Sequence, residues 1–483
     1  MQKKREGKFM FSCPNCGGNL KFDIPSQQLS CEYCHELFNP YAFEDKKSDA
    51  EEEKSYESNY EVTIFTCPQC GGEILSTDNA AAGFCSFCGA STILYSRISH
   101  ERRPNYIIPF QKSKEDCKNA YRNMMRHAIF APKELKDPKY IDSFRGIYMP
   151  YWAYYVTQQG SFRVKGKKEY RRGDYIYKDY YDLSGNIDAY YKGLSYDASS
   201  SFADNISEQL APYDVKGMKA FTPSFLSGFY ADTADVAPSI YQGNAETTAQ
   251  EQTLQQVKTI PDFKPYDISA TMGENDSFHT ETKEVDSTMF PVWFMSYRNK
   301  DRVAYVTVNG QTGKVVADLP IDPKKYILGS IILAIPLFLL LASFITLLPA
   351  LLVGISIFLA IATIVLTSVE LYKIKAKDSD ANDRGKQYIK EVSGTPVPPV
   401  TSSEEQKEEP PKRKNARALC VIAAIVSLLI LIINPVSDIF YYAGAIFCLA
   451  AVLISIIDVI RFYNVLSTRR LPQFDKQGGD DRA

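Results

Sequence analysis

Two stretches of the sequence repeat one cysteine pattern: CPNCGGNLKFDIPSQQLSCEYC (13–34) and CPQCGGEILSTDNAAAGFCSFC (67–88). Each holds two C-x2-C pairs with fourteen residues between them, and the second copy is the first displaced by 54 positions. A tetrahedral Zn²⁺ ion prefers four thiolates, and two C-x2-C turns on neighbouring hairpins supply them. We predict two small β zinc ribbons with these ligands: Cys13, Cys16, Cys31, Cys34, Cys67, Cys70, Cys85 and Cys88.

The residues around the cysteines agree with metal-binding turns. Both first pairs run into two glycines, Gly17-Gly18 and Gly71-Gly72, which tolerate the positive φ that such a turn needs. After the fourth cysteine the second copy has Gly89, whereas His35 of the first copy must accept a strained backbone or a looser turn. The alternative is two disulfides per module, but close C-x2-C pairs are typical of metal sites in a reducing compartment. Four thiolates close the coordination shell, so we expect two structural Zn²⁺ ions.

The charge of the ribbon region argues against nucleic acid as its partner. Ribbon 1 is expected at 1–45 and ribbon 2 at 59–104, joined by the charged linker KKSDAEEEKSYES at 46–58. Residues 1–104 hold 11 Lys and Arg against 15 Asp and Glu, a net charge of −4 (11 − 15). Two zinc ions with four thiolates each would make this about −8, whereas phosphate binding needs positive charge. We therefore expect the ribbons to contact proteins.

Two long apolar blocks follow the polar part of the chain. The first, 326–371, holds one charged residue at its very end, and as one helix it would be about 69 Å long, against a bilayer core of roughly 30 Å. It must cross twice, turning near Pro349, and Pro336 should kink its first half. The second block breaks at NPVSD (434–438). We predict four transmembrane helices in two hairpins, 323–372 and 416–461, with spans at 326–347, 350–371, 416–434 and 439–460.

The basic residues next to the spans predict their orientation. Both hairpin tips lack Lys and Arg, so the positive-inside rule places the N-terminal part, the linker 373–415 and the tail 462–483 in the cytoplasm. This indicates a multi-pass protein of the cell membrane, with both termini cytoplasmic. Few ionisable residues lie inside the spans, which favours anchoring over transport. The flanking basic residues are Lys324, Lys325, Lys373, Lys375, Lys377, Lys412, Arg413, Lys414, Arg417, Arg461, Arg469 and Arg470.

Residues 105–322 predict an aromatic-rich α+β domain with mainly antiparallel strands. The chain contains 32 Tyr and 27 Phe but only two Trp, and both Trp open similar aromatic strands. A capping pattern at Ser113 predicts a helix that ends near Ala131, and a longer polar helix is expected at 235–257. The expected strands are 106–110, 147–155, 162–164, 170–181 and a hairpin at 303–316. The linker 373–415 reads as disordered.

One stretch of this domain combines basic and aromatic residues. Such a pattern can bind single-stranded nucleic acid or anionic lipid headgroups, and it can also be the solvated face of a strand. A domain tethered beside a membrane would meet lipid first. The candidate residues for binding an anionic surface are Arg163, Lys165, Lys167, Lys168, Arg171, Arg172 and Lys178.

No pattern in the sequence predicts catalysis. The four histidines lack partners at catalytic or metal-ligand spacing, and no phosphate-binding loop, G-x-S-x-G or H-E-x-x-H motif occurs. The 483-residue chain has a net charge of −2, without the overall basic excess of a nucleic-acid coat protein. We expect no enzymatic activity.

The cysteine pairs CPNCGG…CEYC and CPQCGG…CSFC resemble the transcription-factor-IIB type of zinc ribbon. The wider order is similar to that of bacterial membrane proteins, common in Gram-positive species, that carry such ribbons and are largely uncharacterised. This resemblance rests on YIIPF (106–110), IFAP (129–132), GIYMPYW (146–152), FLSGFYAD (225–232) and FPVWF (290–294). It implies a membrane anchor, in some members for envelope-stress scaffolds of the phage-shock type.

The sequence thus favours a zinc-binding membrane anchor or adaptor that presents its ribbons and its α+β domain to a cytoplasmic or membrane-associated protein. A membrane-tethered protein that binds nucleic acid through the ribbons and 163–178 is the second hypothesis. Transport or catalysis by the spans is the third and is disfavoured.

Overall fold

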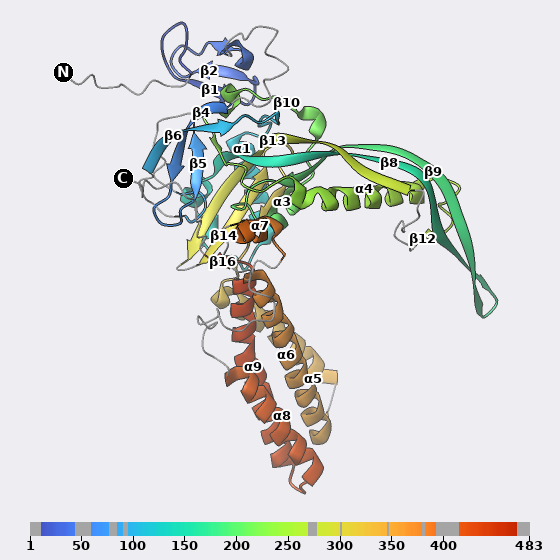
Figure 1. Ribbon diagram of the computed structural model, residues 1–483. Helices are drawn as coiled ribbons and strands as arrows, with labels where there is room; N and C mark the ends of the chain where they lie inside the picture. Colours follow the sequence, from blue (N-terminus) through green and yellow to red (C-terminus); the bar gives the residue numbers. More distant parts are fainter. Residues whose placement is uncertain are drawn as a thin grey trace.

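The computed structural model places a β-rich domain between a small N-terminal ribbon and a bundle of long helices (Figure 1). A long β arm leaves the domain sideways and bends toward the side from which the bundle projects. The linker 46–58, most of the linker 373–415 and most of the tail 462–483 lie outside the described residues. The structure describes residues 11–43, 59–76, 85–89, 95–268, 278–299, 302–344, 347–378, 382–392 and 415–470.

The first ribbon is an antiparallel sheet of three short strands. These are β1 (Leu20–Asp23), β2 (Gln28–Cys31) and β3 (Leu37–Phe38), followed by the 3-10 turn η1 (Pro40–Phe43). Leu20 and Leu29 are buried between this sheet and the β domain, so the ribbon shares the main core of the protein.

The second ribbon belongs to the 13-stranded main sheet. Its strands β4 (Asn59–Thr66), β5 (Glu73–Ser76) and β6 (Tyr95–Arg102) join the sheet where β5 pairs with β11 (Tyr230–Ala231). The expected division at residue 104 therefore does not coincide with an edge of the sheet.

The main sheet is built largely from antiparallel pairs. Only two pairs among the described strands run parallel, β7 with β13 and β8 with β11. The expected hairpin at 303–316 is formed by β14 and β15. The remaining strands are β7 (Tyr106–Ile107), β8 (Arg145–Arg172), β9 (Tyr175–Asp197), β10 (Lys219–Ala220), β12 (Asp267–Ile268), β13 (Phe278–Asn299), β14 (Arg302–Asn309), β15 (Val315–Ala317) and β16 (Arg469–Arg470).

Two helices of the domain lie close to their expected positions. In α1 (Lys114–His127) Ser113 and Asp116 form the expected capping box, and Cys117 and Tyr121 face the core. The polar helix expected at 235–257 is α4 (Ser239–Thr259). The other helical elements are η3 (Glu134–Lys136), α2 (Pro138–Ile141), α3 (Asp204–Leu210), η4 (Val215–Gly217) and η5 (Pro223–Leu226).

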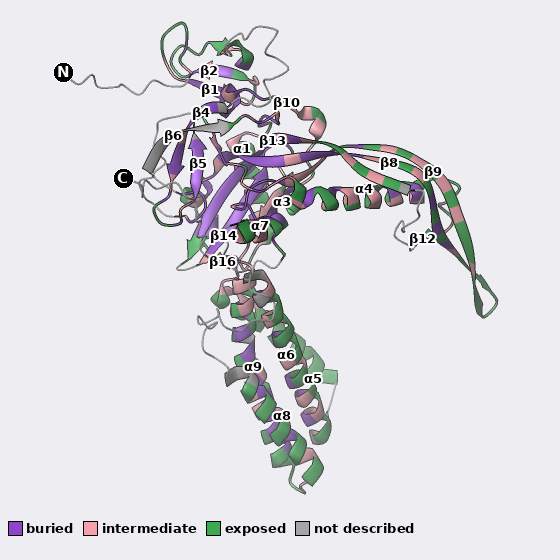
Figure 2. Cartoon of the chain, in the orientation of Figure 1, coloured by how far each residue is buried: buried purple, intermediate pink, exposed green. Residues whose placement is uncertain are grey.

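The arm is one continuous hairpin, where the sequence predicted separate strands at 147–155, 162–164 and 170–181. Strand β8 runs for 28 residues and β9 for 23, and they pair from Tyr151 with Asp197 out to Arg172 with Tyr175. Helix α4 covers one face of the arm. Its buried residues recur every four positions, which places them on one side of the helix, and most are small: Tyr241, Ala245, Ala249, Thr253 and Val257. Figure 2 shows the covered base of the arm as buried and its far end as exposed.

Four apolar helices form the part of the molecule that projects from the domain. Three are long and apolar enough to cross a membrane: α5 (Pro323–Phe344), α6 (Pro349–Asp378) and α9 (Asp438–Leu466). The fourth, α8 (Asn415–Ile433), has the shorter apolar stretch Ala418–Ile433.

The helices α6, α8 and α9 pack through small side chains. Their shared core is built around Ala360, Cys420, Ala423, Cys448 and Ala451. Small residues let helix backbones approach closely where lipid supplies no hydrophobic driving force. Helix α5 instead exposes most of its apolar side chains, and its first turns lie against Phe130, whose ring is 5.3 Å from that of Tyr326.

One part of the expected disordered linker is helical. Helix α7 (Arg384–Val392) is capped by the preceding residue, Asp383, whose carboxylate accepts a hydrogen bond from the Lys386 amide at 3.0 Å. The Arg384 amide donates to the Asp204 carboxylate at 2.9 Å, and Gly385 lies against Tyr241 of α4. The prediction of disorder was wrong here. It rested on composition alone, whereas α7 is ordered by contacts with Asp204 and α4, which are far away in the sequence.

The end of α9 is fastened to the domain. The Arg302 guanidinium donates at 2.8 Å to the Val465 carbonyl, at the helix end where unpaired carbonyls gather. The Asn464 side chain bonds both the amide and the carbonyl of Ile321, at 2.7 and 2.8 Å. Bundle and domain are therefore joined by directional hydrogen bonds as well as by the chain.

Candidate metal centres

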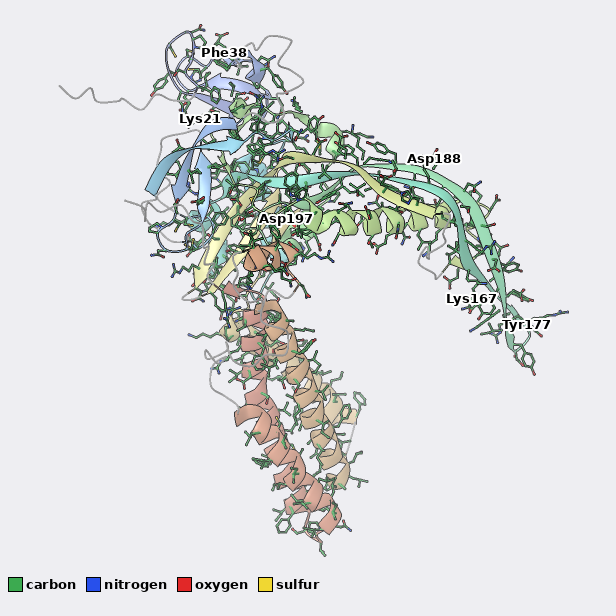
Figure 3. The ribbon with its side chains drawn as sticks, in the orientation of Figure 1. Lys21, Phe38, Lys167, Tyr177, Asp188 and Asp197 are labelled. Carbon is green, nitrogen blue, oxygen red and sulfur yellow. The ribbon has the colours of Figure 1, made fainter. Side chains whose placement is uncertain are left out.

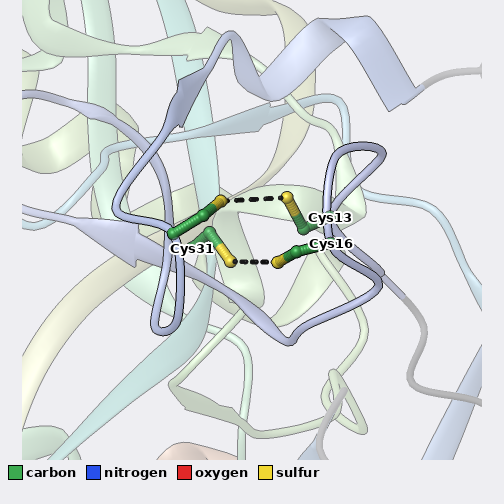
Figure 4. A group of neighbouring side chains, drawn as sticks. Cys13, Cys16 and Cys31 are labelled. Atoms are coloured by element: carbon green, nitrogen blue, oxygen red, sulfur yellow. Dashed lines mark hydrogen bonds between the residues drawn. The ribbon is translucent and has the colours of Figure 1, made fainter.

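The eight predicted ligand cysteines come together as two separate groups of four. Within each group the sulfur atoms lie within 4.8 Å of one another. The Sγ–Sγ distances are 3.5 Å for Cys13–Cys34 and 3.4 Å for Cys16–Cys31 in the first group, which Figure 4 shows. In the second group, the two closest sulfur pairs are both 3.8 Å apart.

These distances fit a tetrahedral ion. With metal–sulfur bonds of about 2.3 Å, the edge of a tetrahedron of sulfurs is about 3.8 Å. Two four-thiolate groups of this size could each hold a metal ion, with all four ligands coming from the protein. Such a closed shell holds the chain together and leaves no position open for a substrate.

The backbone of each group forms the expected tight turns. In the first turns, the Cys13 amide donates to the Gly18 carbonyl at 2.7 Å and the Cys67 amide to the Gly72 carbonyl at 2.9 Å. The φ angles of Gly17 and Gly71 are 73° and 72°. The strain predicted at His35 is present, because its φ is 57° where Gly89 of the second copy has 71°.

The two centres differ sharply in burial. In the first, Cys13 and Cys31 are buried whereas Cys16 and Cys34 are exposed. In the second, all four cysteines are buried in a cluster with Phe65, Ile74 and Phe87. Two copies of one motif have thus become a surface ribbon and an internal one.

The second centre is held by the hairpin β13–β14. The Tyr305 hydroxyl donates to the Phe87 carbonyl at 2.8 Å, and the Arg298 guanidinium to Gln69 at 2.9 Å. Gly89 lies so close to this hairpin that a Cβ would be 3.2 Å from that of Arg298. Ribbon 2 is therefore a structural part of the sheet.

The first ribbon docks on the loop before β11. The Phe22 ring contacts Phe225 edge-on at 5.3 Å, and the Ser224 hydroxyl donates to the Pro40 carbonyl at 2.7 Å. The same segment continues into β11, which pairs with β5 of ribbon 2. Residues 223–231 thus connect both ribbons, a role that the sequence reasoning missed although it singled out FLSGFYAD.

Contacts among the thiols shift their protonation. The neighbouring Cys85 thiol lowers the pKa of Cys67 to about 6, and hydrogen bonding to Cys67 in turn raises the pKa of Cys85. A thiol must lose its proton before it can bind a metal ion, so loading either centre releases protons. Among the other cysteines, burial raises the pKa of Cys117, which suits a thiol that only fills space.

The structure separates the basic residues of 163–178 onto two faces of the arm. Residues directly opposite each other in the pairing of β8 and β9 share a face, and alternate positions point to opposite faces. Arg163, Lys165, Lys167, Arg171 and Lys178 lie on the face away from α4. Lys168 and Arg172 lie on the other, in line with the buried Phe162 and Val164.

Carboxylates neutralise part of this charge. Lys165 pairs with Asp182 at 2.5 Å, and Glu169 pairs with both Lys167 and Lys178. Arg163, Lys168 and Arg172 have no ion pair within the described part of the chain. The seven residues are thus not one continuous cationic surface.

Buried carboxylates at the base of the arm gave no sequence signal. Asp197 is 2% exposed and accepts from the Ser207 hydroxyl, while its second oxygen and the hydroxyl of the similarly buried Tyr151 have no hydrogen-bond partner among the described residues. Burial raises the pKa of Asp197 well above its usual range. The polar stretch DASSSFAD (197–204) shows no sign of this burial in the sequence.

The comparisons with known proteins give one similar sequence. The chain is 27% identical over 326 residues to the "Uncharacterized protein YdjG" of Bacillus subtilis (strain 168), covering 65% of this chain and 91% of that protein. No family model and no solved structure matches the chain. The cysteine groups and the apolar helices together indicate a metal-binding membrane protein with an uncharacterised relative.

Proposed function

We propose that this chain is a zinc-binding, multi-pass membrane anchor that recruits a protein partner through its first ribbon. The metal is proposed to be Zn²⁺ because four thiolates at tetrahedral spacing are its preferred shell. Ribbon 2, the β domain and the end of α9 hold ribbon 1 at the end of the molecule far from the bundle (Figure 1). The metal centres stabilise this arrangement and have no catalytic role in the proposal.

The observation that carries the proposal is the exposed apolar edge of ribbon 1. Tyr33, between the two cysteines of the second pair, is 76% exposed, and Leu37 is 45% exposed. A ribbon that only braced the domain could have polar residues there, as solvent-facing turns usually do. Aromatic side chains on a rigid, metal-clamped turn are typical of the central contacts of protein interfaces.

The proposed topology places the domain and both termini in the cytoplasm, with four spans in two hairpins. It is supported by the docking of α7 on α4 and of the α9 end on Arg302, which put both chain segments beside the β domain. The turns near Pro349 and Val436 lie at the other end of the bundle (Figure 1). The reducing cytoplasm would also keep the thiols able to bind metal.

The test compares three versions of the full chain, expressed in the native host and crosslinked in intact cells. They are the wild type, the double variant Tyr33→Ala/Leu37→Ser, and the control Tyr190→Ala, which removes another exposed tyrosine, from the arm. We expect a protein that is crosslinked to the wild type and the control and lost from the double variant. All three should retain two zinc ions per chain. An identical set of crosslinked proteins from all three would contradict recruitment through this edge.

A further inference from the structure

Among the residues that the structure describes, none covers either face of the outer end of the arm. Beneath the arm, Phe162 and Val164 pack with Val257 and Ile268, and farther out the Tyr181 ring contacts Tyr266 at 4.9 Å. Strand β12 pairs only as far out as Lys167. Beyond that point, residues 168–172 and 175–179 pair only with each other in the described part of the chain. This leaves about 17 Å of two-stranded hairpin, a structure that is marginal in water without a further partner.

The tip of this hairpin combines exposed apolar and cationic side chains. Tyr175 is 72% exposed and Ile176 is 64% exposed, and next to them the rings of Tyr170 and Tyr177 stack at 5.5 Å. Arg172 has no ion pair in the described structure, and the only carboxylate near Arg171 is 4.0 Å away, on Asp174. Aromatic and apolar side chains beside arginines are typical of segments that lie in the membrane–water interface.

The arm points its tip to the side of the molecule where the membrane would lie. It leaves the domain sideways and then bends toward the side of the bundle (Figure 1). Figure 3 shows Asp188 before this bend, and Lys167 and Tyr177 on the part beyond it. Arg302 and Asn464 fasten the end of α9 to the same domain from which the arm projects.

We propose that the arm tip, Tyr170–Tyr177, binds the anionic lipid headgroups of the membrane that the bundle spans. Tyr175 and Ile176 enter the interface, and Arg171 and Arg172 bind lipid phosphates. The contact gives the unsupported hairpin its missing partner and makes a second attachment point, far from the bundle. This inference rests on the membrane location of the bundle, but not on recruitment of a partner by ribbon 1.

Nucleic acid fits this surface less well than lipid. Asp182 and Glu169 pair with the lysines behind the tip, which removes charge that a phosphate backbone would need. Ile176 has no π face for stacking on a base, whereas an aliphatic side chain at the tip gains free energy in an acyl boundary.

The test uses quenching of tryptophan emission by brominated lipids. The chain has only two tryptophans, Trp152 and Trp293, both in the domain, so a Tyr175→Trp variant adds one probe at the tip. The full-length protein is placed in nanodiscs of brominated phosphatidylcholine containing about a third of phosphatidylglycerol, a strongly anionic surface. We expect strong quenching of the added emission.

The matched control is Tyr190→Trp, which places the probe at an exposed tyrosine nearer the base of the same arm. Its emission should stay at the level of the unbrominated discs. Equal quenching at the two positions, or none at either, would overturn the proposal.

The part played by charge is tested with Arg171→Gln/Arg172→Gln in the Tyr175→Trp background. Each cation near an anionic surface favours binding about fivefold, so losing both should lower tip insertion about 25-fold. Discs of phosphatidylcholine alone should lower it similarly. Quenching that is unaffected by the arginine substitutions and by removal of the anionic lipid would contradict anionic-lipid binding. Quenching of the probe's emission by a labelled oligonucleotide, with no effect of brominated lipid, would assign the surface to nucleic acid instead.

Discussion

At the scale of single residues, equivalent cysteines of the two ribbons differ in burial and therefore in their expected contribution to stability. Cys16 and Cys70 hold the same place in the repeated motif, yet Cys16 is exposed and Cys70 is 3% exposed in a cluster beneath the main sheet. Binding of structural zinc contributes its free energy directly to folding. The second centre has all four cysteines buried, so its loss should destabilise the domain more than loss of the first centre, which is half exposed.

The first prediction follows from this difference. Cys16→Ser and Cys70→Ser should each lower the zinc content from two ions per chain to one. Cys70→Ser should also lower the Tm of the β domain by about 10 °C or more, since several kcal/mol of zinc binding are lost inside the core. Metal analysis and thermal unfolding in detergent measure the two effects. Cys117→Ala serves as a control and should keep both ions; an equal fall in Tm for the two serine variants would be inconsistent with the burial described above.

A second residue-scale prediction concerns Asp197. Burial raises its pKa far above the value of about 3.9 for an aspartate in the unfolded chain. Between those two values the folded protein holds a proton that the unfolded chain releases, so wild-type stability falls as the pH rises through this range. Asp197→Asn removes the titration, and its amide oxygen can still accept from Ser207.

The gap in unfolding free energy between Asp197→Asn and the wild type should therefore widen as the pH rises above about 4, by about 1.4 kcal/mol for each pH unit below the folded-state pKa of Asp197. Asp188→Asn changes an exposed carboxylate of the same strand and should show no such widening. Thermal unfolding over this pH series is the measurement. A gap that stays constant with pH would show that burial does not raise the pKa of Asp197.

At the scale of elements, the membrane helices depend on small residues at their crossings. The Ser427 hydroxyl of α8 donates to the Gly444 carbonyl of α9 at 3.0 Å. A Cβ on Gly444 would lie 3.0 Å from the end of the Ile430 side chain and 3.2 Å from the Ser427 hydroxyl oxygen. Gly354 of α6 has open space at the same position. The two glycines differ in packing alone, although both lie in apolar helices.

Gly444→Leu should destabilise the bundle by about 1–3 kcal/mol, as overpacking of a close contact does. Gly354→Leu, the matched change, should have little effect. The fraction of protein that stays folded on heating in detergent, followed by size-exclusion chromatography, distinguishes them. If both variants behave alike, α8 and α9 do not cross as described.

At the scale of the whole molecule, the bundle and the domain act as one body with a defined polarity. The end of α9, the helix α7 and the start of α5 all contact the domain, so the two interhelical turns project away from it. This geometry agrees with the side preferred by the flanking basic residues.

The topology predicts that Val436→Cys, at a fully exposed turn position, reacts in intact cells with a membrane-impermeant maleimide. Gln387→Cys, in α7, should react only after the cells are opened. Native Cys16 and Cys34 should stay unlabelled in intact cells, which makes the wild type an internal control. Labelling of Gln387→Cys in intact cells, with none at Val436→Cys, would reverse the proposed orientation.

Much of the local structure followed from the sequence because short-range physics sets it. The cysteine spacing brought four sulfurs together twice, and the capping box at Ser113 marked the start of α1. The apolar blocks indicated membrane helices, three of which have the required length. The arm was only partly foreseen, since periodicity finds short strands but not the helix that lies under them and lets two strands run on together.

What the sequence determined by itself is the chemistry that neighbouring residues impose: two four-thiolate clamps, the turns that shape them, and helices too apolar for water. What only the tertiary structure decided is the place of each part. The second ribbon lies inside the sheet and the first on its surface, α7 is ordered, and the seven basic residues of the arm are divided between two faces. These outcomes depend on contacts between segments far apart in the chain, where the gain from burying surface decides among arrangements that local preferences leave equal.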